Sequence, residues 1–456
     1  MNALILSAIF GVIMMFSGVF LKQKNTVRLV AILGIAVLVV ANILEMNGVL
    51  FFKVNTAGMM HFDRFALLFN SIAFISALIY FILSAKDIEK VGVHYAEYFA
   101  LTFFILSGIV LTTSFKSLLI LFLGIEIISI PLYILTGSDK KNLKSNEASL
   151  KYFLMGSFST GLMLMGITLI YGATGTFSVE QMKFVIDKPT LLPVAGMLLL
   201  IFSMAFKVSA APFHFWTPDV YDGAPTVFTS FMATIVKAAV FIGFIRLFDE
   251  TFGSFHEQWQ LWIAIITVAT LFIGNITAVF QQSVKRMLAY SSIAQAGFML
   301  LALYAMNTDA KEGILLYAAA YCLATIGIFS VLAKMNDYSF EGFNGLAKQQ
   351  PLVAAVTTIL FLSLAGIPLT AGFLAKFYML KAALGNGNHV WLVIFAVLMA
   401  AVSAYYYFRV IQAMYFKEGQ ATIQASPAFK WSLAGLAAVI IILGIFPNVL
   451  LYWFYF

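Results

Sequence analysis

The sequence predicts an all-α polytopic membrane protein with about fourteen transmembrane helices, two of them broken. Of its 456 residues, 62% are hydrophobic and 10% are charged, and the mean hydropathy is +0.97. A typical soluble domain has about 25% charged residues, so this composition excludes a soluble domain of useful size. Apolar windows of about 20 residues, the length that crosses a bilayer as a helix, recur from end to end. We therefore expect a single membrane domain over residues 1–456.

Short charged or turn-forming segments separate the apolar windows. The first window has no basic start and is too long for a signal peptide, so it is predicted to be a span. The predicted spans are 3–21, 28–46, 62–84, 95–113, 115–135, 148–172, 190–210, 225–248, 260–281, 284–304, 312–333, 352–384, 389–416 and 430–453.

The Lys and Arg residues divide unevenly between the two predicted faces. Three lie deep in apolar windows; of the others, sixteen fall on the side of the loop after the first span and eight on the opposite side. Basic residues concentrate in cytoplasmic loops, so the first side is predicted to be cytoplasmic and both termini to lie outside. The net charge of +7 therefore reports topology and does not indicate nucleic-acid binding.

Two of the predicted spans contain helix breaks. Lys207 to Pro212 leads into the polar stretch PFHFWTPDVYDGAPT, and Gly366, Pro368 and Gly372 interrupt a later apolar run. Proline inside a helix removes a backbone hydrogen bond and clashes with the preceding turn. Inside a bilayer such breaks survive only within protein or beside water, and paired breaks in two halves of a chain point to a transport site.

The two breaks also suggest an internal repeat. IFSMA at 201–205 resembles FLSLA at 361–365, and each precedes a break. If each belongs to a five-helix unit, the units are 95–248 and 260–416, and both breaks fall in the fourth helix. An odd number of spans makes the second unit inverted relative to the first. The short match alone leaves the inverted repeat and the absence of a repeat equally open.

Four charged residues lie deep inside predicted spans: Glu126, Lys207, Lys237 and Lys376. A charged group at bilayer depth costs about 2.5–3.5 kcal/mol on insertion scales and usually marks a transport pathway. Glu126 is the natural partner of Lys207, because it is the one carboxylate well inside a predicted span. The alternatives are a static ion pair for Lys207 and side chains that reach the interface for Lys237 and Lys376.

Further polar residues in or near the spans have two readings each. Lys151 is either an interfacial anchor or the start of a proton route, and His214 is either a proton relay or a structural histidine. The start of the tenth span offers polar groups for water, although ordinary helix packing explains them nearly as well: Arg286, Tyr290, Ser291, Ser292 and Gln295.

No recognised cofactor or metal pattern occurs in the chain. The single cysteine, Cys322, excludes disulfides within the chain and cysteine-ligated clusters. The sequence has neither a phosphate-binding glycine loop nor a haem-ligand histidine pair. We therefore expect no cofactor-binding and no metal-binding residues, so redox energy must come from a partner.

Three segments carry a family resemblance that covers essentially the whole chain: KVSAAPFHFWTPDVYDGAPT (207–226), SVKRMLAYSSIAQAGF (283–298) and LSLAGIPLTAGFLAKFY (362–378). They resemble the antiporter-like membrane subunits of the proton-pumping NADH:quinone oxidoreductase (complex I), and most of all subunit N, the counterpart of mitochondrial subunit 2. The resemblance implies fourteen helices, two inverted five-helix repeats and broken seventh and twelfth helices.

The resemblance also implies roles for residues. Glu126, Lys207, Lys237 and Lys376 match family positions that translocate protons, and the lysine at 376 favours subunit N over subunit M, which has glutamate there. Lys151 and His214 also match positions thought to support proton transfer. The implied path runs from the cytoplasm to the Glu126–Lys207 pair, through Lys237, and out through Lys376.

As a subunit of this oxidoreductase, a translocase, the chain would act in a bacterial inner membrane, driven by quinone reduction elsewhere in the complex. Its expected partners are the other complex I subunits, especially the neighbouring antiporter-like and small membrane subunits, and the lipid bilayer. FMN, iron–sulfur clusters and quinone would belong to partner subunits. The alternatives are a subunit of a cation/proton antiporter and a passive scaffold.

Overall fold

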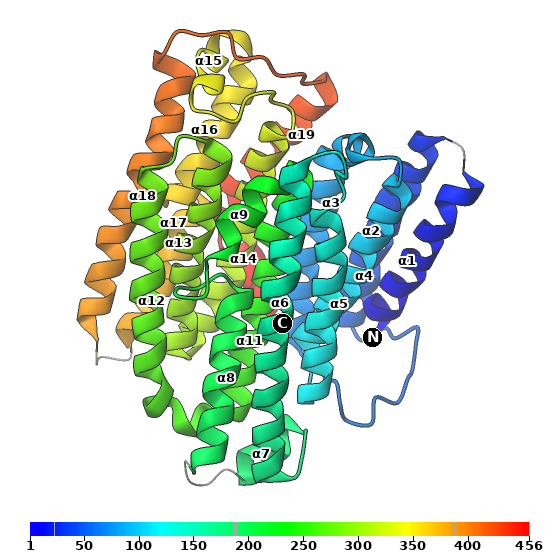
Figure 1. The fold of residues 1–456 in the computed structure, drawn as a ribbon, viewed down its shortest axis with the longest axis vertical. Helices are drawn as coiled ribbons and strands as arrows, with labels where there is room; N and C mark the ends of the chain where they lie inside the picture. Colours follow the sequence, from blue (N-terminus) through cyan, green and yellow to red (C-terminus); the bar gives the residue numbers. More distant parts are fainter. Residues whose placement is uncertain (22, 186–189, 386–388, 456) are drawn as a thin grey trace.

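The computed structural model describes residues 1–21, 23–185, 190–385 and 389–455, which form a bundle of helices without a sheet (Figure 1). Lys22 and Lys188, included in the charge count, lie outside these ranges. The helices are α1 (Asn2–Phe20), α2 (Lys24–Met46), α3 (Arg64–Val91), α4 (Tyr95–Ser114), α5 (Leu118–Thr136), α6 (Leu143–Thr174), α7 (Val179–Val185), α8 (Leu191–Lys207), α9 (Trp216–Gly223), α10 (Thr226–Phe231), the π-helical turn η1 (Met232–Val236), α11 (Lys237–Thr251), the 3₁₀ turn η2 (Gly253–Phe255), α12 (His256–Val279), α13 (Val284–Ala305), α14 (Thr308–Leu332), the 3₁₀ turn η3 (Glu341–Phe343), α15 (Leu346–Gln349), α16 (Pro351–Ala365), α17 (Ala371–Gly385), α18 (Val390–Phe416), α19 (Pro427–Ile445) and α20 (Asn448–Tyr455).

Twelve helical segments of the described chain are long and apolar enough to cross a membrane, with α10, η1 and α11 counted as one. The prediction of an all-α polytopic membrane protein is confirmed. The shorter apolar helices α8 and α16 coincide with the two predicted breaks. The total of fourteen, which counts each broken pair as one crossing, stays a prediction.

The end of the chain differs from the predicted last span, 430–453. That segment is divided between α19 and α20, because α19 ends at Ile445 and a new helix begins at Asn448. Pro447 lies between them, has no N–H to donate and cannot continue the helix. The predicted last span is therefore two helices and not one continuous helix.

Helices differ strongly in burial, which locates the centre of the bundle. The most apolar window of α14 and that of the α10–α11 segment are fully buried, whereas only 28% of that window in α1 is buried. Figure 1 shows α14 and α11 near the middle, with α1 and α2 on one flank and α18 on the other. A helix that is apolar all round belongs in the interior or against lipid, so the deep charged residues of α11 lie in protein.

The pairing of helices is alike in the two predicted five-helix units. In 95–248, α4 packs on α5, α6 packs on α8, and α11 returns to α4. In 260–416, α12 packs on α13, α14 packs on α16 and α17, and α18 returns to α12. The broken helix is fourth in each unit. The division into two inverted repeats stays a prediction, since pairing alone does not establish the inversion.

Ion pairs tie both ends of α3 to neighbouring parts of the bundle. Arg246, whose side chain is 2% exposed, lies 2.6 Å from Asp63 and donates to the Thr113 carbonyl at 2.7 Å. Near the other end of α3, Asp87 pairs with Lys334, which follows the end of α14. Breaking such a buried pair leaves an uncompensated charge, so the pairs fix how the helix ends pack.

Candidate functional site

The first helix break positions Lys207 at the end of α8. Ser209 adopts a left-handed conformation with φ of 65°, and the Ala210 N–H donates to the Ala205 carbonyl at 2.8 Å. The Phe206 carbonyl accepts from the Trp216 indole N–H at 3.0 Å, just where α9 begins. The Ala205 and Phe206 carbonyls at the break are thus satisfied within protein, as a bilayer requires.

The side chains of Glu126 on α5 and Lys207 at the end of α8 approach each other. Lys207 Nζ lies 4.0 Å from Glu126 Oε1, and the two side chains are 7% and 21% exposed. The two side chains do not hydrogen-bond to each other; each bonds to a neighbouring hydroxyl. Lys207 donates to Ser129 Oγ at 3.0 Å, and Thr160 Oγ1 donates to Glu126 Oε1 at 2.7 Å. The pair that the sequence predicts is therefore brought together, with 4.0 Å between the ammonium and the carboxylate oxygen.

Lys237 lies at the junction of η1 and α11, directly after one π-helical turn. Such turns widen a helix and are frequent at functional sites. Its Nζ donates to Ser292 Oγ at 2.5 Å and to the Ser292 carbonyl at 3.2 Å, and it lies 5.6 Å from the centre of the Tyr221 ring. Lys237 is 1% exposed, so it does not reach the interface. All its hydrogen-bond partners among the described residues are neutral.

Lys376 lies beside the second break, which separates α16 from α17. Its Nζ donates to the Ala365 carbonyl, in the last turn of α16, at 3.0 Å and lies 4.6 Å from the centre of the Phe298 ring. Lys376 is 6% exposed. A freed helix carbonyl thus replaces the carboxylate that a buried ammonium would otherwise need, and the break itself creates the site.

Gly372 closes this second break, and we expect Gly372→Ala to prevent it from forming. A Cβ at Gly372 would lie 1.8 Å from the Ser363 carbonyl oxygen, which belongs to rigid backbone. Overpacking of this kind costs about 1–3 kcal/mol or more. The yield and the Tm of the purified assembly should both fall. Gly161→Ala on α6 is the matched control, because a Cβ there meets nothing within 4 Å; equal stability of the two variants would contradict the expectation.

Polar side chains of α13, α14 and α18 connect the surroundings of Lys237 and Lys376. Tyr321 donates to Ser292 Oγ, the acceptor of Lys237, at 3.0 Å. One turn away, Tyr317 donates to Gln295, whose amide donates at 3.1 Å both to Tyr407 and to the Leu364 carbonyl. A cavity with room for about one water lies between these groups and Lys376.

The interval between Lys207 and Lys237 has a different character. Buried polar atoms without a hydrogen-bond partner among the described residues gather around the first break: Ser209 Oγ, His214 Nδ1, Thr217 Oγ1 and Ser230 Oγ. Buried polar groups in proteins are normally satisfied, commonly by ordered water. His214 itself is buried and packs on Phe215, and among the described residues it forms no hydrogen bond to Lys207. Ordered water would satisfy these unpartnered polar atoms at the first break.

Lys151 lies apart from the deep residues, in a cluster of charges near the start of α6. Its side chain is 42% exposed and pairs with Asp219 at 2.9 Å and Glu147 at 2.8 Å. Arg286 donates to the other oxygen of Asp219 at 3.0 Å. Burial alone would raise the pKa of Asp219, but the hydrogen bonds from Lys151 and Arg286 outweigh it and hold this pKa below its ordinary value of 3.8.

The lowered pKa of Asp219 predicts how its contribution to stability depends on pH. A depressed carboxyl pKa contributes stability that is present above the unfolded value and is lost as pH falls through the folded value. Asp219→Asn should therefore lower Tm equally at about pH 8 and about pH 6, and the difference should shrink below about pH 4. The pair is largely exposed, so the effect should be about 1 kcal/mol or less. A difference that vanished between pH 8 and pH 6 would contradict this; Glu97→Gln, at an exposed pair, is the control.

Several of these partners were not singled out from the sequence: Thr160, Asp219, Tyr221, Tyr317, Tyr321 and Tyr407. The tyrosines at 317 and 321 are four residues apart within an apolar span, a spacing that puts both on one helix face and was a usable signal. In the described residues, no group of three or more His, Cys, Asp or Glu side chains is placed to hold a metal ion.

A membrane bundle with two broken helices and a row of buried lysines defines the class of antiporter-like membrane subunits. The family model described as NADH:quinone oxidoreductase/Mrp antiporter, TM, matches residues 116–403. NADH-quinone oxidoreductase subunit N of Cytophaga hutchinsonii is 40% identical over 99% of both chains. The chain belongs to this family, and within it to the subunit N group.

Solved structures agree with this assignment. A chain of respiratory complex I from Thermus thermophilus, solved with bound aureothin, is 30% identical, with a TM-score of 0.85 over 99% of this chain and 98% of that one. A chain of the Mrp complex from Dietzia sp. shares the fold alone, at 18% identity, with a TM-score of 0.87 over 99% of this chain and 96% of that one.

Proposed function

We propose that this chain is a proton-translocating membrane-arm subunit of a respiratory NADH:quinone oxidoreductase. The observation that carries the proposal is the row of buried ionisable groups, each beside a helix irregularity: the Glu126–Lys207 pair and Lys376 at the two breaks, and Lys237 at the π-helical turn. A charge kept at such cost in a membrane interior indicates a transport pathway. The name of the subunit N relatives identifies the driving reaction as electron transfer from NADH to quinone.

The path runs from the cytoplasm to Glu126 and Lys207, on to Lys237, and out through Lys376. The first interval depends on water beside the unpartnered polar atoms of the first break, and the second on the Ser292, Tyr321 and Gln295 hydrogen bonds. Two unit charges 4 Å apart attract by about 4 kcal/mol at an effective dielectric constant of 20. Widening the Glu126–Lys207 gap therefore favours release of the lysine proton, and closing it favours uptake.

Quinone reduction in partner subunits changes this gap, while FMN, iron–sulfur clusters and quinone stay in those partners. The neighbours are the antiporter-like and small membrane subunits of the complex. The chain resides in a bacterial inner membrane with both termini on the outer side, an orientation that the two-to-one excess of basic residues on one face supports. Lys151 and His214 lie beside the main path. Lys151 holds the ion-paired cluster at the cytoplasmic face, and His214 binds water at the first break.

The deciding experiment is Lys207→Ala in the complete complex reconstituted into vesicles. The expected result is normal assembly with proton translocation per NADH oxidised reduced by about tenfold or more, because a positioned proton-transfer group contributes about 10²–10⁴-fold. Lys53→Ala, at an exposed lysine, is the control. Undiminished translocation in the Lys207 variant would refute the proposal, and a loss of assembly in that variant but not in the control would favour a passive scaffold.

A second candidate, a subunit of a cation/proton antiporter, is favoured by the shared fold of the Mrp chain. It predicts that a sodium or potassium gradient drives proton exchange without NADH. The same vesicles test this directly: proton movement under an imposed cation gradient, abolished by Lys207→Ala, would select the antiporter.

A further inference from the structure

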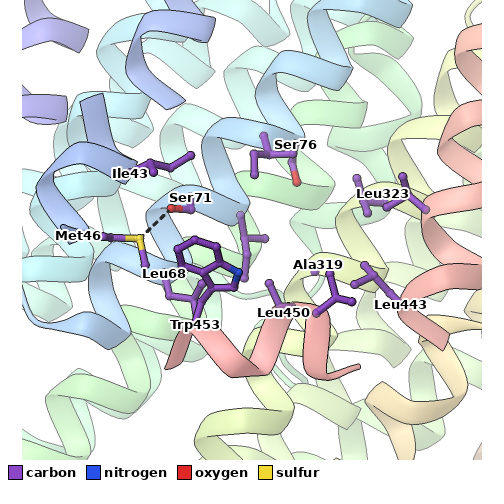
Figure 2. Close-up of a pocket in the computed structure, with 14 residues that line it drawn as sticks. Ile43, Met46, Leu68, Ser71, Ser76, Ala319, Leu323, Leu443, Leu450 and Trp453 are labelled. Carbon is purple, nitrogen blue, oxygen red and sulfur yellow. Dashed lines mark hydrogen bonds between the residues drawn. The ribbon is translucent and has the colours of Figure 1, made fainter. Parts of the chain in front are cut away.

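An apolar groove lies on the flank of the bundle, away from the buried lysines. It has a volume of about 330 Å³ and is formed by α2, α3, α14, α19 and α20 (Figure 2). Its lining is almost entirely aliphatic or aromatic, and its hydroxyl side chains are Ser71 and Ser76. Ser71 already bonds the Leu67 carbonyl and Asn42. Ser76 Oγ has no hydrogen-bond partner among the described residues, so it is the one hydroxyl of the lining still free to bind water, and the rest of the groove is apolar.

The depth of the groove matches one leaflet of a bilayer. Along α3 the lining runs from Leu68 to Ser76, which is about 12 Å at 1.5 Å per residue. The hydrocarbon core is about 30 Å thick, so half of it is about 15 Å. α20 closes the shallow end, where Figure 2 shows the Trp453 ring beside Leu68 and Leu450. Tryptophan is typical of the membrane–water interface.

A basic residue, Arg64, lies just outside the shallow end of the groove. Arg64 is one helical turn before Leu68 on the same face of α3, about 6 Å nearer the interface. Arg64 is exposed, and no ion pair among the described residues involves it. The neighbouring carboxylate, Asp63, pairs with Arg246 instead. The ring contact of Phe65 with Phe454, 6.2 Å between centres, places this turn of α3 against α20.

We propose that the groove binds one acyl chain of a phospholipid whose phosphate is held by Arg64. The charge of the guanidinium complements a phosphate, and Arg binds phosphate through paired N–H donors. The site lies outside the proton path, so it stands whether or not the proposed function holds.

The test uses the complete complex in vesicles that contain phosphatidylglycerol with a photoactivatable group at the end of one acyl chain. Illumination followed by peptide mass spectrometry should show adducts concentrated around Ser76 and Leu323, at the deep end of the groove. Ala319→Phe, which fills the groove, should reduce these adducts by about tenfold or more. Arg64→Gln should reduce them by about fivefold, because one basic residue near the surface contributes about 1 kcal/mol to lipid binding.

Two matched controls complete the design. Val397→Phe introduces the same side chain on an exposed face of α18, and Lys86→Gln removes an exposed charge at the other end of α3; neither should alter the adducts. Labelling of the groove no denser than labelling around Val397 would overturn the site. Unchanged labelling in Arg64→Gln would overturn the phosphate contact, and preferential labelling by an isoprenoid probe would assign the groove to a quinone tail.

Discussion

Lys237→Arg is expected to reduce NADH-driven proton translocation by about tenfold or more, even though arginine keeps a positive charge at this position. The guanidinium does not release its proton in proteins, whereas a lysine ammonium does. Among the described residues, Lys237 is held by Ser292 and the Tyr221 ring and by no anion, so proton exchange is what the side chain offers. The measurement is vesicle acidification per NADH oxidised.

The arginine variant separates proton exchange from a static charge. If Lys237 only fixed the packing of α11 on α13, arginine would substitute well and Lys237→Met would fail. If the lysine exchanges protons, arginine and methionine should fail alike. Assembly is checked by native gel and by electron transfer from NADH to an artificial acceptor, both of which should stay near wild type. Full translocation by the arginine variant would end the assignment of Lys237.

The deep charges and the two breaks were predictable because each is a local violation of an apolar pattern. A lysine in a 20-residue apolar window costs the same wherever the helix packs, so Lys237 and Lys376 stand out from composition alone. The breaks follow from proline and glycine, whose backbone restrictions are also local. These features required no knowledge of neighbouring helices.

The partners of these charges were not predictable, because they depend on helix rotation and on contacts far apart in the sequence. Thr160 meets Glu126 across 34 positions, and Ser292 meets Lys237 across 55. No local pattern predicted the π-helical turn before Lys237. Likewise, nothing in the apolar windows indicated that Lys151 would pair with Asp219, 68 residues away. The sequence therefore identifies the ionisable groups, and only the fold defines their surroundings.

Glu126→Gln is expected to have the second large effect, a fall in proton translocation of about tenfold or more. Glutamine keeps the shape of the side chain and can still accept from Thr160, which donates to Oε1 at 2.7 Å. What it loses is the negative charge 4.0 Å from Lys207, worth about 4 kcal/mol at an effective dielectric constant of 20. Without that charge, moving the two helices apart no longer changes the proton affinity of the lysine.

Thr160→Val is the matched control for this variant, because it removes the hydrogen bond and leaves the charge. A neutral hydrogen bond contributes about 0.5–1.5 kcal/mol and one to a charged group about 1.5–3 kcal/mol, so this loss should be the milder of the two. Translocation per NADH should thus fall in the order wild type, Thr160→Val, Glu126→Gln. If the valine variant were the more severe, geometry at Glu126 would matter more than its charge, and the switch would have to be sought in the position of α6, not in the electrostatic coupling of the pair.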